Sequence, residues 1–292
     1  MTTRLILTSD LHQQPDKWSQ LVQAAADQKA NIILIAGDLL PKIGGAEEQR
    51  LYFPYLRRSL TLIRDQTGAT VLLYMGNDDC HFLEPLLDEL AADGLCVNLA
   101  GRVCKLRGLV FCGMNKVRDY PFGYKHYCVP DGDYVTSPTQ FMGEGVTYDL
   151  TGKQIRIANL REYLLAKPCI GNELDMLAGQ LREDEWARSI WMIHQPPTGL
   201  GMDILGGGCG SVGSPTILRF IQERQPLLGC SGHIHESPYQ QGGHWAARVS
   251  RAMWIQPGQV SGRLHYACCD ITDDLSIRDL RHNIFGSFPD VD

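Results

Sequence analysis

Hydrophobic positions along the first ninety residues form two alternating patterns, short continuous apolar runs and longer runs with helical spacing. The short runs, which are typical of strands, cover residues 4–8, 32–36 and 70–75. The longer runs, which have one apolar stripe as in amphipathic helices, cover residues 16–28, 46–66 and 84–93. Such β-α-β alternation predicts parallel strands joined by right-handed crossovers.

Beyond Gly94 the pattern indicates an antiparallel hairpin, with Arg107-Gly108 as its turn, and then a return to mixed elements. Helices are expected at 173–181 and 214–225 and strands at 189–193 and 227–230, followed by several short strands in the last sixty residues. Pro54 lies inside the long helical run and predicts a kink or a division into two helices. We find no repeat and no linker, so we expect residues 1–292 to form a single domain.

Residues 115–168 lack clear periodicity, and we interpret them as an insertion rich in aromatic residues. Its aromatic side chains include Tyr120, Phe122, Tyr124, Tyr127, Tyr134, Phe141 and Tyr148. A connection of this length is often functional. A lid over the substrate and a satellite cluster packed on the core are both compatible with this composition.

Overall composition sets limits on partners and location. The net charge of −6 and the pI near 5.8 disfavour a broad nucleic-acid surface, but not a small phosphate ester, because bound metals reverse the local potential. No apolar run approaches the roughly 18 residues of a membrane span, and a strand begins within a few residues of the start. We therefore expect a cytoplasmic protein without membrane contact, whose ten cysteines are reduced and mostly buried.

Five short polar motifs follow the ends of apolar runs. They are Asp10-Leu11-His12, Gly37-Asp38, Gly76-Asn77-Asp78-Asp79, His194, and Gly232-His233-Ile234-His235. Taken singly, most have ordinary explanations as turns or helix caps. The carboxyl ends of parallel strands gather ligands at one edge of a sheet, so the motifs are expected to converge. They offer seven oxygen or imidazole ligands, enough for two divalent metals with Asp38 as the bridge.

The ordered set of motifs resembles the calcineurin-like metallophosphoesterase superfamily over residues 10–235. The part from His194 to Glu236 also resembles the metallophosphoesterase-domain (MPPED-like) and class III cyclic-nucleotide phosphodiesterase branch. This resemblance implies an α/β fold, a four-layer αββα sandwich of two mixed β-sheets with metals held on loops at one rim.

The resemblance also implies roles for individual residues. Asp10, His12 and His235 would hold one metal, Asn77, His194 and His233 the second, and Asp38 both. A hydroxide shared by the ions would attack phosphorus in line with the leaving oxygen. Ligands of nitrogen and oxygen without thiolate suit manganese, iron or zinc. Asp38, Asn77, Asp78 and His194 are the expected catalytic residues.

Asp78 is the point at which the chain departs from the family pattern. Many members have a histidine after the asparagine that is thought to protonate the leaving group, and an ionised aspartate cannot do so. His81 and His126 are possible substitutes, although an ordinary place on the surface or in a loop is the simpler explanation for each.

These observations predict a metal-dependent phosphoesterase that hydrolyses phosphodiesters, with a small phosphoester or nucleotide as substrate. The alternatives are a phosphomonoesterase or nucleotidase of the same fold, and a metal-binding scaffold without turnover. Metal identity and oligomeric state do not follow from the chain.

Overall fold

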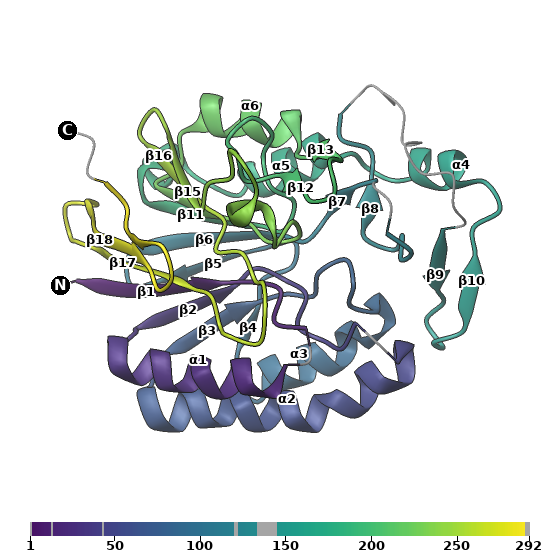
Figure 1. Cartoon of the computed structure of the whole chain (residues 1–292), viewed down its shortest axis with the longest axis horizontal. Helices are drawn as coiled ribbons and strands as arrows, with labels where there is room; N and C mark the ends of the chain where they lie inside the picture. The colour runs from purple at the N-terminus through teal and green to yellow at the C-terminus, as the bar shows by residue number, and fades with distance from the viewer. Residues whose placement is uncertain (1, 13, 43, 120–121, 133–144, 290–292) are drawn as a thin grey trace.

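Two mixed β-sheets face each other, and helices cover the outer side of each (Figure 1). The computed structural model describes residues 2–12, 14–42, 44–119, 122–132 and 145–289. The layers run helix, sheet, sheet, helix, so the expected four-layer αββα sandwich is confirmed.

The first sheet has a parallel centre and antiparallel strands on one side. Its spatial order is β19 (Gly286–Ser287), β18 (Ile277–His282), β17 (Ala267–Ile271), β1 (Thr3–Thr8), β2 (Ile32–Ile35), β3 (Thr70–Leu73) and β4 (Val97–Asn98). The second sheet is parallel from β16 to β6 and antiparallel at its two edges. Its order is β15 (Ala246–Val249), β16 (Ala252–Ile255), β14 (Leu228–Cys230), β11 (Ser189–Ile193), β6 (Leu109–Met114) and β5 (Arg102–Leu106).

The helices divide between the two outer faces (Figure 1). The first sheet is covered by α1 (Pro15–Gln28), α2 (Gly45–Thr67) and α3 (Glu84–Ala92). The second is covered by α5 (Ile170–Ala178) and α6 (Pro215–Arg224). Three short 3₁₀ turns, η1 (His81–Leu83), η2 (Glu183–Arg188) and η3 (Ser237–Tyr239), lie in the connections.

The central strands are buried on both faces. Leu5 and Leu7 of β1 pack between the two sheets, whereas Ile6 packs under the helices. A strand covered on both sides needs apolar residues at every position, which accounts for the continuous apolar runs in the sequence. The carboxyl ends of these buried strands are therefore held firmly, and the polar motifs begin there.

One of the two expectations for the long helical run is corrected. α2 continues through Pro54 as a single helix, without division into two. Pro54 lies on the exposed face, so water can hydrogen-bond the carbonyl that loses its helical partner.

The insertion packs as a small annex at one side of the sandwich (Figure 1). Its elements are β7 (Val117–Arg118), β8 (Cys128–Val129), β9 (Val146–Tyr148), β10 (Gln154–Arg156) and α4 (Leu160–Leu165), and a second excursion forms β12 (Ile204–Leu205) and β13 (Gly210–Ser211). Tyr127 and Tyr148 join the core under α1 to α3, which supports the satellite-cluster interpretation for these two residues. Tyr120, Tyr134 and Phe141 lie outside the described residues.

Two further expectations can be compared with the structure. All ten cysteines are free, and eight of them are buried. Among the described residues, no helix is long and apolar enough to cross a membrane.

His282 makes the fold sensitive to acid. Its Nε2–H donates to the Pro257 carbonyl at 2.8 Å, and its Nδ1 accepts from the Ile284 amide at 3.0 Å, so the ring is bonded as the neutral form. Burial lowers the pKa of His282 to about 4. In the unfolded chain the pKa of this histidine is about 6.5, so between pH 6.5 and pH 4 the unfolded state binds more protons than the folded state. The contribution of His282 to stability is therefore full above about pH 6.5 and falls as the pH drops towards 4.

Between pH 7 and pH 5 the unfolding free energy of the parent should fall, in part because His282 titrates. We predict that this fall is about 2 kcal/mol smaller in His282→Gln, because glutamine can donate to the Pro257 carbonyl but does not titrate. Urea denaturation at both pH values measures the difference. The exposed His244→Gln is the control, and an unchanged pH slope in His282→Gln would contradict the assignment.

Candidate metal centre and active site

The predicted site residues come from strand ends of both sheets and meet at one rim of the sandwich. Asp10 and His12 follow β1, Asp38 follows β2, Asn77 follows β3, His194 follows β11, and His233 and His235 follow β14. The first three strands belong to one sheet and the last two to the other. The site therefore exists only because the two sheets pack face to face.

The backbone at this rim bends in the left-handed region. Asp10, His12, Asp38 and His233 have φ of 54°, 38°, 54° and 68°. Residues other than glycine rarely adopt this conformation, and such strain tends to cluster at functional sites. The bend turns each chain away from its strand direction as soon as the strand ends.

Glycines precede three of the ligand positions because the site leaves no space for a side chain there. A Cβ at Gly37 would lie 2.5 Å from His194 Nδ1, and a Cβ at Gly232 would lie 2.8 Å from Asp10 Oδ2. At Gly76 a Cβ would overlap the Asp38 carboxylate. The glycine in each motif thus allows the close approach of a neighbouring loop.

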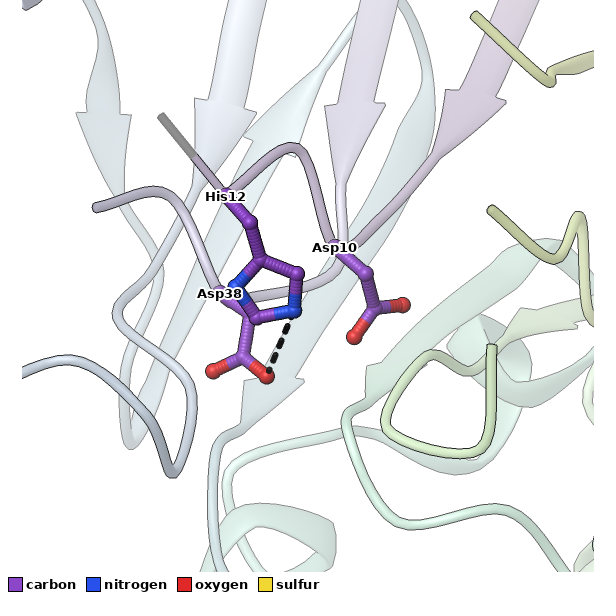
Figure 2. Close-up of side chains that lie close together, drawn as sticks. All are labelled: Asp10, His12 and Asp38. Carbon is purple, nitrogen blue, oxygen red and sulfur yellow. Dashed lines mark ion pairs between the residues drawn. The ribbon is translucent and has the colours of Figure 1, made fainter. Parts of the chain in front are cut away.

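Asp10, His12 and Asp38 form the first group of side chains (Figure 2). One ligand atom from each lies within 4.8 Å of the others, and His12 Nε2 is 3.7 Å from Asp38 Oδ2. Asp10 Oδ2 and both ring nitrogens of His12 are buried without a hydrogen-bond partner. The His235 ring lies 5.8 Å from that of His12, and its Nδ1 is also buried without a hydrogen bond.

Asn77, His194 and His233 form the second group. Asn77 Oδ1 lies 2.9 Å from His194 Nε2 and 2.6 Å from His233 Nδ1. Asp38 Oδ2 is 3.4 Å from His194 Nε2, so the same carboxylate borders both groups. All seven residues predicted as ligands are brought to this rim.

The charges at the rim shift the pKa values of its members. Burial alone raises the pKa of Asp38, but the charge and hydrogen bond of His194, with smaller effects from His12 and the Asp78 amide, lower it well below its usual range. Burial lowers the pKa of His194, but the charge of Asp38, the hydrogen bond to it and smaller effects of Asp10 and the Ala36 carbonyl together raise it to about 9. Burial lowers the pKa of His12 and, much further, that of His233.

The donor set fits a divalent cation. Buried polar atoms are almost always hydrogen-bonded, but Asp10 Oδ2 and both ring nitrogens of His12 have no hydrogen-bond partner among the described residues. His194 Nδ1–H donates to the Ala36 carbonyl at 2.6 Å, which turns Nε2 towards the other ligands. Such a backbone contact on the second ring nitrogen is usual for metal-binding histidines.

Asp78 is buried beside the second group, and both of its carboxylate oxygens have a partner. Its Oδ1 accepts from Asn77 Nδ2 at 3.0 Å, and its Oδ2 lies 2.8 Å from Lys42 Nζ. Burial, followed by the charge of Asp38, raises the pKa of Asp78, and Lys42 opposes the shift.

His81, which is half-buried, and His126, which is buried, lie side by side with ring centroids 5.0 Å apart. His126 Nε2–H donates to the Asp79 carbonyl at 2.6 Å. Burial lowers the pKa of His126 to about 3, so this ring is neutral at physiological pH. These contacts favour a structural role over proton donation.

Three residues near the site were missed by sequence reasoning. Asp79 appears in the motif, but only its contacts show that it joins two ligand loops. Phe122 of the insertion lies edge-on to His233, with ring centroids 5.2 Å apart, so the insertion borders the site. Lys42 has no motif around it, and no sequence signal points to it.

Aspartate, asparagine and histidine side chains meet at one rim between two mixed sheets, and comparison with known proteins identifies the family. A family model described as calcineurin-like phosphoesterase matches residues 3–237. The chain belongs to this family. Membership confirms the resemblance of the motifs to the calcineurin-like superfamily and implies a hydrolase acting on phosphoester bonds.

Solved structures agree on the fold. A crystal structure with 15% sequence identity superposes with a TM-score of 0.59, covering 95% of this chain and 98% of its own. The protein TT1561 of Thermus thermophilus, with 14% identity, gives a TM-score of 0.54 and covers 92% of this chain and 94% of its own. At such identities the likeness concerns the fold alone. Comparison with the sequences of curated proteins finds no match.

Asp79 ties the ligand loops together through buried backbone amides. Its Oδ2 accepts from the amides of Leu39 at 2.9 Å and Gly76 at 2.8 Å, and its Oδ1 accepts from that of Leu40 at 2.8 Å. The loop after β2 and the loop after β3 are thus held by one carboxylate.

We predict that Asp79→Ala lowers the unfolding free energy by about 3 kcal/mol or more, because three buried amides lose their acceptor. Asp79→Asn, which keeps one acceptor oxygen, should lose less. Urea denaturation measures both, with the exposed Asp65→Ala as control. If Asp79→Ala stayed within about 0.5 kcal/mol of the parent, the proposed tie would be excluded.

Proposed function

We propose that this protein is a binuclear metal-dependent phosphodiesterase acting on a small phosphoester or nucleotide. Asp10, His12 and His235 would hold one ion, and Asn77, His194 and His233 the other, with Asp38 between them. The observation that carries the proposal is the position of Asp38, whose Oδ2 lies 3.7 Å from His12 Nε2 and 3.4 Å from His194 Nε2.

Metal binding would be supported by the protonation states of the ligands. Divalent ions require deprotonated ligands, and the low pKa values of Asp38 and His233 meet this need. His194 would have to release a proton to bind a metal. An adjacent metal ion favours this release, because the ion takes the place of the protonated ring as the positive charge beside Asp38. When bound, two such ions polarise the phosphoryl oxygens and lower the pKa of a shared water. A set of nitrogen and oxygen donors suits manganese, iron or zinc.

The proposed preference for diesters is supported by the position of Asp78, which stands where many family members have a histidine. Asp78 is bonded to Asn77 and Lys42, so it does not offer the proton that a poor leaving group requires. The branch resemblance over residues 194–236 agrees with this choice.

We also propose that the chain acts as one domain, because both sheets supply ligands to the same rim. The edge contact of Phe122 with His233 brings an aromatic ring of the insertion beside the second ligand group, where it could contact a substrate.

With manganese added, we expect bis-p-nitrophenyl phosphate to be hydrolysed faster than p-nitrophenyl phosphate, as measured by release of nitrophenolate. Asp38→Asn should lower kcat by at least about 10³-fold and reduce the metal content, because the shared carboxylate is lost. Asp65→Asn, an exposed aspartate on α2, is the matched control. A faster reaction with the monoester would overturn the diester assignment, and unchanged rate and metal content in Asp38→Asn would overturn the bridging role.

A further inference from the structure

Lys42 stands at the border between the buried rim and solvent. It lies in the loop between β2 and α2, four residues after Asp38. Its Nζ pairs with Asp78 Oδ2 at 2.8 Å, and its side chain is 57% exposed, whereas that of Asp78 is 11% exposed. The Lys42 ammonium is therefore held by a buried carboxylate on one side and accessible to solvent on the other.

The anchor itself is rigid. The Asp78 amide donates to Asp38 Oδ1 at 2.9 Å, and Asp78 Oδ1 accepts from Asn77 Nδ2 at 3.0 Å. These bonds fix the carboxylate and, at the same time, turn Asn77 Oδ1 towards His194 and His233. Only Asp78 Oδ2 remains for Lys42, so the position of the ammonium is set by the same contacts that orient a proposed metal ligand.

Lys42 supplies a positive charge beside the buried carboxylates of the rim through its ion pair with Asp78. Within the described part of the chain, no other lysine or arginine forms an ion pair with Asp10, Asp38, Asp78 or Asp79. Among these residues, Lys42 is thus the lysine or arginine that is ion-paired with a carboxylate of the rim.

An ammonium has three N–H donors, and Asp78 Oδ2 accepts from one of them. Phosphoryl oxygens are strong acceptors, and a point-like ammonium on a flexible stem is a common partner for them. We propose that Lys42 binds a non-bridging phosphoryl oxygen of the substrate, and that Asp78 acts as a positioning residue for both Lys42 and Asn77. This inference rests on the proposed function for the identity of the ligand. The inference accounts for the presence of Asp78 beside a phosphate site, because this aspartate positions the Lys42 ammonium.

Phosphate binding tests the proposal without requiring turnover. Inorganic phosphate is titrated calorimetrically into the manganese-loaded protein. Lys42→Met should raise the Kd by about tenfold or more, and Lys42→Arg should restore most of the affinity, because a charged donor returns. Metal content should not change, since Lys42 is not a proposed ligand. Thermal unfolding should shift to lower temperature in Lys42→Met, because the buried Asp78 carboxylate loses its ion pair, and should recover in Lys42→Arg. An unchanged Kd in Lys42→Met would overturn the inference.

Lys105 provides a matched control. Its Nζ pairs with a buried carboxylate, Glu185, at 2.7 Å, and its side chain is 54% exposed, as at Lys42, but it lies on the edge strand β5. Lys105→Met should leave phosphate binding unchanged. An equal loss in both variants would mean that any such ion pair acts through stability, and would contradict a contact with phosphate.

The double variant Lys42→Met, Asp78→Asn separates binding from neutralisation. If Lys42 only balanced the charge of Asp78, removing both charges would restore affinity and KM, which would overturn the proposal. If Lys42 contacts the phosphate, the double variant stays impaired. A parent protein that binds phosphate through Lys42 but hydrolyses no ester would refute the proposed function and leave this inference standing. Hydrolysis with the same KM in the parent and in Lys42→Met would support the proposed function and refute the role of Lys42.

Discussion

Burial of several carboxylates in a small volume is the constraint on which the rest of this structure depends. Asp10 and Asp79 are 0% exposed, Asp38 is 2% exposed and Asp78 is 8% exposed, all at one rim. Buried charges are costly unless each is paired or hydrogen-bonded. Asp79 is bonded to amides and Asp78 to Lys42, whereas Asp10 Oδ2 has no partner and Asp38 faces two histidines. Asp10 and Asp38 thus border the positions where the proposed metals would lie.

The fold supplies the means to hold such a site. Strands buried on both faces fix the ends from which the ligands depart, and left-handed residues turn the chain there at once. Glycines at positions 37, 76 and 232 leave space for the neighbouring loop. The site is thus assembled from rigid strand ends of two sheets, and its precision does not depend on a long loop.

Much of this arrangement follows from local sequence. The strand at 189–193 and the capping of α6 by Ser214, whose Oγ accepts from the Ile217 amide at 3.0 Å, agree with the sequence because strand pattern and cap chemistry act locally. The helix predicted at 173–181 begins at Ile170, since Cys169 and Asn172 form an unusual cap. Lys42 and Phe122 could not be predicted, because their contacts with Asp78 and His233 join segments distant in the chain. The proposed ligands could be picked out from the sequence only because five motifs occur together in one order.

Anomalous scattering from crystals grown with manganese tests the central claim most directly. The account predicts two manganese peaks per chain, one beside Asp10, His12 and His235 and one beside Asn77, His194 and His233, with the Asp38 carboxylate in contact with both. A single peak, or two peaks that Asp38 does not join, would contradict a binuclear centre built on this carboxylate.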